Sequence, residues 1–317
     1  MARLPLLGIH HVTAIAGDPG GTLAFYAGVL GLRLVKKTVN FDDPETYHLY
    51  FGDEVGHPGT IMTFFPWPGA PRGRHGVGQL TVTSFAAPPS SLGYWSKRLQ
   101  SHGVTAERSE VLGEDVLAFH DPDGLRLEIV GMADAASRPG WTGGPVPAEQ
   151  AIRWFAHVTL AEQGYEATAR ILSEVMGFRL AAESGNRFRY AAAKDGPGTR
   201  VDVLCLPDAP PGRIAVGTVH HVAFRVAGDA EQREWRQRLV AQGLNVTPVL
   251  DRQYFRSIYY REPGGVLFEI ATDPPGFTVD EPLADLGTGL KLPPGLEPAR
   301  ARIEAVLPPL SDSRVHG

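Results

Sequence analysis

The sequence has little of what characterises secreted or membrane proteins. Its 317 residues include a single cysteine, Cys205, so no internal disulfide can form and a reducing compartment is expected. No apolar run reaches the roughly 18 residues of a membrane span. The first residues carry one Arg and only a short apolar segment, which is not the pattern of a secretory signal. We therefore expect a cytoplasmic protein that does not enter a membrane.

Dense clusters of positive charge are also absent. Lys and Arg number 30 against 35 Asp and Glu, and the formal net charge is −5. Nucleic acids and anionic membranes are therefore not expected as partners. Hydrophobic residues make up 43% and charged residues 21%, which is typical of a globular protein, and the length suffices for two ordinary domains.

Internal repeats organise the chain. Several segments recur at nearly constant offsets, some 146 residues apart and others 140 or 141 residues apart. The matched pairs are 29–34 with 175–180, 95–103 with 235–243, 121–129 with 262–270, and His11 with His157. Two offsets that each recur indicate two tandem halves, and each half contains two related modules.

Each module has the same predicted elements. A short alternating strand is followed by an amphipathic helix and then by strands rich in β-branched and aromatic residues. In the first module, residues 20–31 (GGTLAFYAGVLG) place Leu23, Tyr26, Ala27 and Leu30 on one helical face, and Gly31 ends the helix. The sequence therefore predicts an α+β fold of four βαβββ modules.

The predicted boundaries follow from this repeat. We expect an N-terminal half over 1–135, a linker rich in Pro, Gly and Ala over 136–150, and a C-terminal half over 151–275. The remaining residues, 276–317, form a Pro-rich tail with one short helix, expected to pack as an arm. This tail permits a homo-oligomer but does not indicate one.

Two histidine doublets, His10–His11 and His220–His221, lie in predicted strands. Because side chains alternate along a strand, one histidine of each doublet is expected to face the opposite way from its neighbour. The corresponding first-strand positions are His11, Leu80, His157 and His221, and the last strands of modules two and four carry Glu128 and Glu269. Two histidines with one carboxylate leave about half of an octahedron open, as in non-heme Fe(II) sites.

Two pairings of modules can assemble such a site. If modules one and four form one cup, its ligands are His11, His221 and Glu269, and the other cup lacks a ligand at Leu80. If modules three and four pair, His157 replaces His11. The spacing does not decide between these pairings, although the shared doublet favours the first.

The sequence resembles the vicinal oxygen chelate superfamily, in which βαβββ modules build metal-holding cups of mixed β-sheet. It is most similar to the ring-cleaving dioxygenases that open p-diphenols such as hydroquinone. The segments that carry the resemblance are GIHHVT, TYHLYFGDEVGHPGTIMTFFPW, GTVHHVAFRV, DRQYFRSIYYREPGGVLFEI and LGTGLKLP. Together they extend over nearly the whole chain.

The resemblance implies a ligand set and a group of pocket residues. The metal ligands would be His11, His221 and Glu269, binding Fe(II), with Mn(II) as an alternative that the same donors accept. The partners would be a small aromatic diol and O₂. The implied catalytic residues are His10, Thr13, His220, Arg252 and Tyr259. Among these, His220 would act as acid or base, Tyr259 would donate a hydrogen bond to reduced oxygen, and Arg252 would hold anionic oxygen or pair with a surface carboxylate.

Three other functions are compatible with this pattern. A catechol-type extradiol dioxygenase remains an alternative because His157 could serve as a ligand, although we expect a structural role for this residue. A divalent-metal glyoxalase or isomerase would use the glutamate as a base, and a binding module would hold no metal. Finally, Phe64, Phe65 and Trp67 are expected in the core, and His48, His57 and His75 at the surface or in loops.

Overall fold

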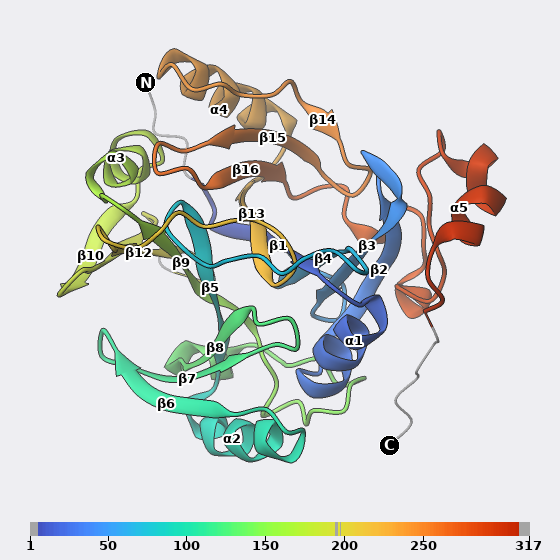
Figure 1. Ribbon diagram of the computed structural model, residues 1–317, viewed down its shortest axis with the longest axis horizontal. Helices are drawn as coiled ribbons and strands as arrows, with labels where there is room; N and C mark the ends of the chain where they lie inside the picture. Colours follow the sequence, from blue (N-terminus) through green and yellow to red (C-terminus); the bar gives the residue numbers. More distant parts are fainter. Residues whose placement is uncertain (1–5, 194–195, 197, 311–317) are drawn as a thin grey trace.

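Two eight-stranded sheets form the body of the protein, in a computed structural model that describes residues 6–193, 196 and 198–310 (Figure 1). The first sheet has the order β14-β15-β16-β13-β1-β4-β3-β2 and the second has the order β10-β11-β12-β9-β5-β8-β7-β6. Modules one and four therefore share one sheet, and modules two and three share the other. The pairing favoured by the doublets is confirmed, as is the α+β fold of four modules in two tandem halves.

We call the sheet of modules one and four the first cup and the sheet of modules two and three the second cup. The strands of the first cup are β1 (Ile9–Ala16), β2 (Arg33–Asn40), β3 (Asp43–Gly52), β4 (Ile61–Pro66), β13 (Thr218–Val226), β14 (Leu250–Asp251), β15 (Arg256–Arg261) and β16 (Leu267–Thr272). Those of the second cup are β5 (Gln79–Ala87), β6 (Ala106–Val111), β7 (Glu114–His120), β8 (Arg126–Gly131), β9 (Trp154–Glu162), β10 (Arg179–Ser184), β11 (Arg187–Ala191) and β12 (Arg200–Cys205). Because each cup draws on both halves, the boundary at 136–150 stays a prediction.

The helices are short and pack against the sheets. They are α1 (Pro19–Leu23), α2 (Leu92–Ser101), α3 (Glu166–Arg170), α4 (Asp229–Ala241) and α5 (Arg300–Val306). Trp95 of α2 and Trp235 of α4 are fully buried and extend the hydrophobic core. No helix within the described ranges is long and apolar enough to cross a membrane.

The first predicted helix is present, but only its first part, Pro19–Leu23, is α-helical. The side chain of Asp18 accepts a hydrogen bond from the backbone of Gly21 and caps α1. After Leu23 the chain widens into a π-helical segment, Ala24–Val29, which is followed by Gly31 at a φ of 69°. Gly31 thus ends the helix as predicted, because a left-handed φ costs glycine little.

The tail packs beside β2 and β3, where Figure 1 shows α5 at the edge of the molecule. Its main anchor is Lys36 of β2, a fully buried lysine whose Nζ lies 2.7 Å from both Asp280 and Glu281. The short predicted helix is present as α5, preceded by a 3₁₀ turn over Glu297–Ala299. Residues 1–5 and 311–317 of the predicted segments lie outside the described residues.

The histidine doublets do not alternate as predicted, because His10 and His220 occupy β-bulges between β1 and β13. The pairs on either side of the bulges are Ile9 with Phe224, His11 with Ala223, Thr13 with His221, and Ala14 with Val219. Each bulge leaves the first histidine without an opposite residue and re-aims its side chain. As a result, the two imidazoles of each doublet contact each other.

Candidate metal centre and pocket

Three neighbouring strands of the first cup bring together the side chains of His11, His221 and Glu269. Across the sheet, His221 of β13 faces Thr13 of β1, two residues after His11, and Ala223 of β13 faces Glu269 of β16. These registers direct the three side chains to one point, where their candidate ligand atoms lie within 4.8 Å of one another, and all three residues are buried.

The distances fit a divalent cation. Glu269 Oε2 lies 3.2 Å from His11 Nε2 and 2.9 Å from His221 Nε2, and the two Nε2 atoms are 3.3 Å apart. Donors about 2.1 Å from an ion and at right angles to each other lie about 3 Å apart. The donor set is therefore suited to a metal ion with open positions on one side.

The bulged histidines fix which nitrogen of each ligand faces the centre. His10 Nδ1 is 2.9 Å from His11 Nδ1, and His220 Nδ1 is 2.8 Å from His221 Nδ1. If Nε2 binds a metal, Nδ1 must carry the proton and donate it to the adjacent imidazole. His10 and His220 then accept at Nδ1 and carry their own proton on Nε2.

Charge around the centre favours metal binding. Burial alone would raise the pKa of Glu269, but the imidazoles of His11 and His221 hold it well below its usual value, so the carboxylate is ionised. Burial lowers the pKa of His221, which keeps its imidazole neutral. Ser257 Oγ donates a hydrogen bond to Oε1 of Glu269, which leaves Oε2 directed at the two histidines.

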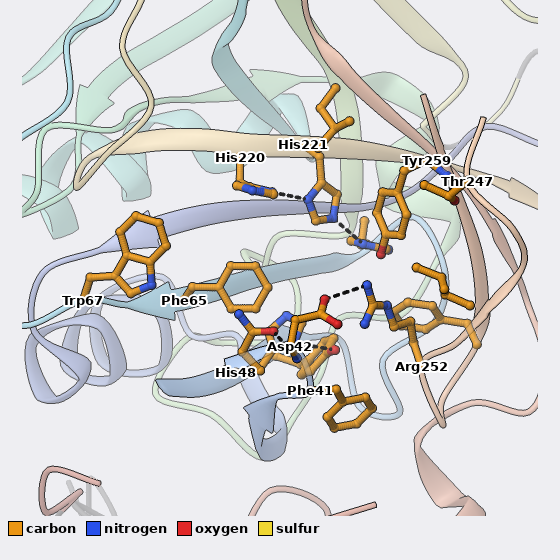
Figure 2. Close-up of a pocket in the computed structure, with 16 residues that line it drawn as sticks. Phe41, Asp42, His48, Phe65, Trp67, His220, His221, Thr247, Arg252 and Tyr259 are labelled. Atoms are coloured by element: carbon orange, nitrogen blue, oxygen red, sulfur yellow. Dashed lines mark hydrogen bonds and ion pairs between the residues drawn. The ribbon is translucent and has the colours of Figure 1, made fainter. Parts of the chain in front are cut away.

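A cavity of about 410 Å³ opens beside this centre (Figure 2). This volume lies within the usual range for small-molecule sites. His11 and His221 line its base, and its walls are largely aromatic and apolar. The other lining residues are Asn40, Phe41, Asp42, His48, Tyr50, Phe65, Trp67, His220, Thr247, Leu250, Arg252, Phe255, Tyr259 and Leu267. Phe65 and Trp67, expected in the core, line the cavity instead, whereas Phe64 is in the core.

Three of the five predicted catalytic residues lie in the cavity wall. The Tyr259 ring centroid is 5.6 Å from that of His221, and burial and Glu269 raise the pKa of Tyr259, which keeps the phenol protonated. Arg252 lies over the Tyr259 ring at 5.5 Å and forms an ion pair with Asp42. Burial, together with the neighbouring His221, lowers the pKa of His220 to about 3, so its imidazole is neutral.

The other two, His10 and Thr13, are not among the described lining residues. His10 contacts His11 and the ring of Phe255, so it reaches the cavity only through its neighbours. Thr13 is fully buried and accepts a hydrogen bond of 2.9 Å from Thr63. Both side chains therefore reach the cavity only through neighbouring residues, and their catalytic role stays a prediction.

Among the histidines, His48 was expected at the surface or in a loop but lines the cavity. Its Nδ1 lies 2.8 Å from the hydroxyl of Tyr50 and its Nε2 lies 2.8 Å from Thr63 Oγ1, which in turn donates to Thr13. Its ring packs on Phe65, 4.3 Å away. Burial holds the pKa of His48 well below its usual value. The alternation in β3, which puts His48 and Tyr50 on one face, was the available signal. His57 and His75 are exposed, as expected.

His157 lies in the second cup, away from the first. There it faces Ser84 across β5 and β9, and its Nε2 lies 3.6 Å from Glu128. The register aligns Val82, and not Leu80 as predicted, with the position of His221, because Val82 faces Thr159 as His221 faces Thr13. Arg189 fills the space beside His157 and forms an ion pair with Asp202.

Comparison with known proteins agrees with this geometry. The sequence model of the Glyoxalase/Bleomycin resistance protein/Dioxygenase superfamily matches residues 8–129 and 154–270. The chain is 48% identical over 303 residues to MhqO of Bacillus subtilis (strain 168), a protein named as a ring-cleaving dioxygenase, with 96% of each chain covered. It is 37% identical over 308 residues to a chlorohydroquinone/hydroquinone 1,2-dioxygenase of Sphingobium indicum, covering 94% of this chain and 95% of the relative.

Solved structures show the same fold. A crystal structure of a protein from Bacillus subtilis subsp. subtilis str. 168, named as a dioxygenase, superposes with a TM-score of 0.92 at 46% identity, covering 97% of this chain and 98% of the other. Glyoxalase I from Zea mays superposes with a TM-score of 0.60 at 14% identity, covering 84% of this chain and 92% of the other, and shows the fold alone.

Proposed function

The chain belongs to the Glyoxalase/Bleomycin resistance protein/Dioxygenase superfamily and is a ring-cleaving dioxygenase, and on that premise we propose that it uses Fe(II) and O₂ to open hydroquinone-type p-diphenols. The observation that carries the proposal is the convergence of His11, His221 and Glu269 at the base of a cavity with aromatic walls. Two imidazoles and one carboxylate are the donor set of Fe(II) sites that leave room for a substrate and O₂ together.

A p-diphenol substrate requires a metal ligand site for one hydroxyl, a protein partner for the other, and an apolar surface for the ring. Fe(II), when bound by these residues, would lower the pKa of a coordinated phenol and pass electrons from the ring to O₂. Since the two hydroxyls lie across the ring, only one can reach the metal, and the other needs a protein partner. Phe41, Phe65 and Trp67 offer apolar and aromatic surface for the ring and exclude water around it.

The remaining polar groups have separate tasks. His220 lines the cavity and, with its Nδ1 engaged by His221, is left to donate a hydrogen bond or a proton from Nε2. Tyr259 stays protonated, so its hydroxyl is a hydrogen-bond donor for oxygen atoms that gain negative charge. His10 and Thr13 support this arrangement through His11 and Thr63.

The proposed reaction consumes one O₂ for each ring that is opened. Both oxygen atoms enter the product, an unsaturated semialdehyde carboxylate formed by cleavage beside the ligated hydroxyl. A divalent-metal glyoxalase or isomerase would leave O₂ untouched. The catechol-type alternative depended on His157 as a ligand. Because His157 lies in the second cup, the structure gives that alternative no support.

The test is anaerobic reconstitution with Fe(II), followed by oxygen uptake with methylhydroquinone and with catechol side by side. We expect uptake of one O₂ per methylhydroquinone, with catechol consumed at least about tenfold more slowly. Faster consumption of catechol would replace the p-diphenol proposal with the catechol alternative. No uptake with either diol, in protein shown to contain iron, would contradict both.

A further inference from the structure

The cavity wall contains an ion pair that joins two distant parts of the chain. Arg252 Nη2 lies 2.9 Å from Asp42 Oδ2. Asp42 belongs to the turn between β2 and β3 in module one, where its backbone N–H donates to the side chain of Asn40. Arg252 follows β14 in module four. Figure 2 shows the two side chains joined beneath Tyr259 and His221, so the pair connects the modules across the cavity.

The two partners differ in exposure. The side chain of Arg252 is 18% exposed, whereas that of Asp42 is 72% exposed. The guanidinium is held on its other side by the ring of Tyr259. Arg252 is therefore a nearly fixed cation of the pocket, and Asp42 covers it from the solvent side. A change at Asp42 can alter the charge of the pocket without disturbing its core.

Apart from histidines, the described lining residues include one cation and one anion, and these are Arg252 and Asp42. Their pairing leaves the wall without uncompensated positive charge. A carboxylate on an entering ring would lose its hydration and find the guanidinium already engaged, which is unfavourable. An uncharged substituent, such as a methyl group or a halogen, meets no such penalty among Phe41, Phe65 and Leu250.

We propose that Asp42 is a specificity-determining residue, which by engaging Arg252 makes the pocket select phenols with uncharged ring substituents over those that carry a carboxylate. The inference rests on the proposed function for its substrate class, since a p-diphenol is the phenol in question. It adds the prediction that removing one exposed carboxylate extends the range of ligands to aromatic acids. A free guanidinium is well suited to bind a carboxylate through two parallel hydrogen bonds.

The test measures binding without turnover. Protein of known metal content is held anaerobically, and calorimetry compares 3- and 4-hydroxybenzoate with the 3- and 4-hydroxybenzamides, which have the same shape without the charge. We expect the native protein to prefer the amides. In Asp42→Asn the affinity for the acids should rise at least about tenfold relative to the amides, which corresponds to about 1.4 kcal/mol.

Two further variants make the result specific. Asp43→Asn is the matched control, because Asp43 is adjacent in the chain and accepts a hydrogen bond from Thr46. It should keep the native preference. The double variant Asp42→Asn/Arg252→Met should lose the gain in acid binding, because the guanidinium that would bind the carboxylate is removed as well. An unchanged preference in Asp42→Asn, or the same gain in Asp43→Asn or in the double variant, would overturn the proposal.

The outcomes separate this inference from the proposed function. Binding of these monophenols requires neither O₂ nor ring opening. A shift of preference in Asp42→Asn, with no oxygen uptake on hydroquinones, would support the role of Asp42 and refute the reaction. Oxygen uptake on methylhydroquinone, with an unchanged ligand preference in Asp42→Asn, would support the reaction and refute the role of Asp42.

Discussion

The two cups of this protein have the same strand register but different centres. His157 of β9 occupies the position of His11 of β1, and Glu128 of β8 occupies that of Glu269 of β16. The second histidine of the first cup, His221, is replaced by Val82. Two of the three candidate ligands are therefore present twice in the chain, while the complete set occurs in the first cup.

The second cup contains charges of its own. Asp202 of β12 takes the place of Thr63 of β4, and Arg189 of β11 takes that of Tyr50 of β3. Arg189 Nε donates to Asp202 over 2.7 Å, and one of its Nη atoms lies 3.5 Å from His157 Nδ1. Arg189 also forms an ion pair with Glu114. The guanidinium is thus a permanent cation beside His157 that pairs with Asp202 and Glu114, whereas Glu128 contacts Ser84 and His157.

This difference teaches that a cup needs a cation, because each one buries a carboxylate that cannot remain ionised alone. In the first cup, a metal ion held by His11, His221 and Glu269 would supply that charge beside the cavity. The second cup has a cation of its own, Arg189, which pairs with the buried Asp202. His221 is therefore the candidate ligand that distinguishes the first cup from the second.

The largest expected effect concerns residues at equivalent positions in the two cups. Glu269→Gln or His11→Ala should abolish stoichiometric metal binding, and turnover should fall by more than the roughly 100-fold that outer hydrogen-bond partners are worth. His157→Ala, at the equivalent position, should retain about one metal per chain. Elemental analysis and oxygen uptake measure both quantities. Loss of metal in His157→Ala would mean that the cups are not functionally distinct.

A second prediction concerns the internal cation. Arg189→Met should destabilise the protein by about 1.5–3 kcal/mol, because it removes charged hydrogen bonds to the buried Asp202, which keeps Arg187 and His157 as neighbours. Arg108→Met is the matched control on the same sheet, since the Arg108–Asp115 pair is exposed to solvent and its loss should leave the stability nearly unchanged. Urea unfolding measures both. Equal stabilities would show that the guanidinium does not hold the second cup together.

Much of this contrast could be predicted from the sequence, because it depends on repeats and residue types. Recurring offsets gave four modules, and the doublets favoured the pairing of modules one and four. The ligand set His11, His221 and Glu269 followed from equivalent positions in that repeat. Such patterns are visible in the sequence alone because each module must bury the same strand faces.

Other features required the register of the strands. An insertion of one residue at a bulge changes the direction of a side chain, so simple alternation gave the wrong orientation for His10 and His220. The bulge in β5 likewise makes Val82, and not Leu80, the equivalent of His221. The pairing of Arg252 with Asp42 joins modules from opposite ends of the chain. His48 was assigned to the surface because a lone histidine in a strand carries no signal without its neighbours Tyr50 and Thr63.

A smaller effect is expected from the serines that orient the two carboxylates. Ser257 donates to Glu269 in the first cup, and Ser84 donates to Glu128 over 2.7 Å in the second. Ser257→Ala should weaken metal affinity by about 10–100-fold, because the carboxylate loses the bond that fixes its orientation. Ser84→Ala should leave the affinity unchanged. Competition with a chromogenic chelator measures both, and equal losses would contradict the assignment of one centre to the first cup.

The smallest expected effect compares the ends of the strands that begin modules one and three. β1 ends in Ala16, whereas β9 ends in the buried Glu162. Burial, together with the charge of the nearby Glu262, raises the pKa of Glu162 to about 8. Glu262 itself accepts hydrogen bonds from Thr168, Gly264 and Val266.

The sign of the pH dependence follows from this raised pKa. An unfolded glutamate has a pKa near 4.3, so the folded state binds the proton of Glu162 more tightly than the unfolded chain does. Its contribution to stability is intact below about pH 4, falls as the pH rises, and is lost above about pH 8. Glu162→Gln keeps a neutral hydrogen-bonding side chain at the end of β9 and removes this loss. The variant should match the native protein near pH 5 and be the more stable of the two at pH 9 in urea unfolding. Parallel decreases for the two proteins between these pH values would show that Glu162 is already ionised in the folded state, and that the end of β9 tolerates the charge which β1 avoids with Ala16.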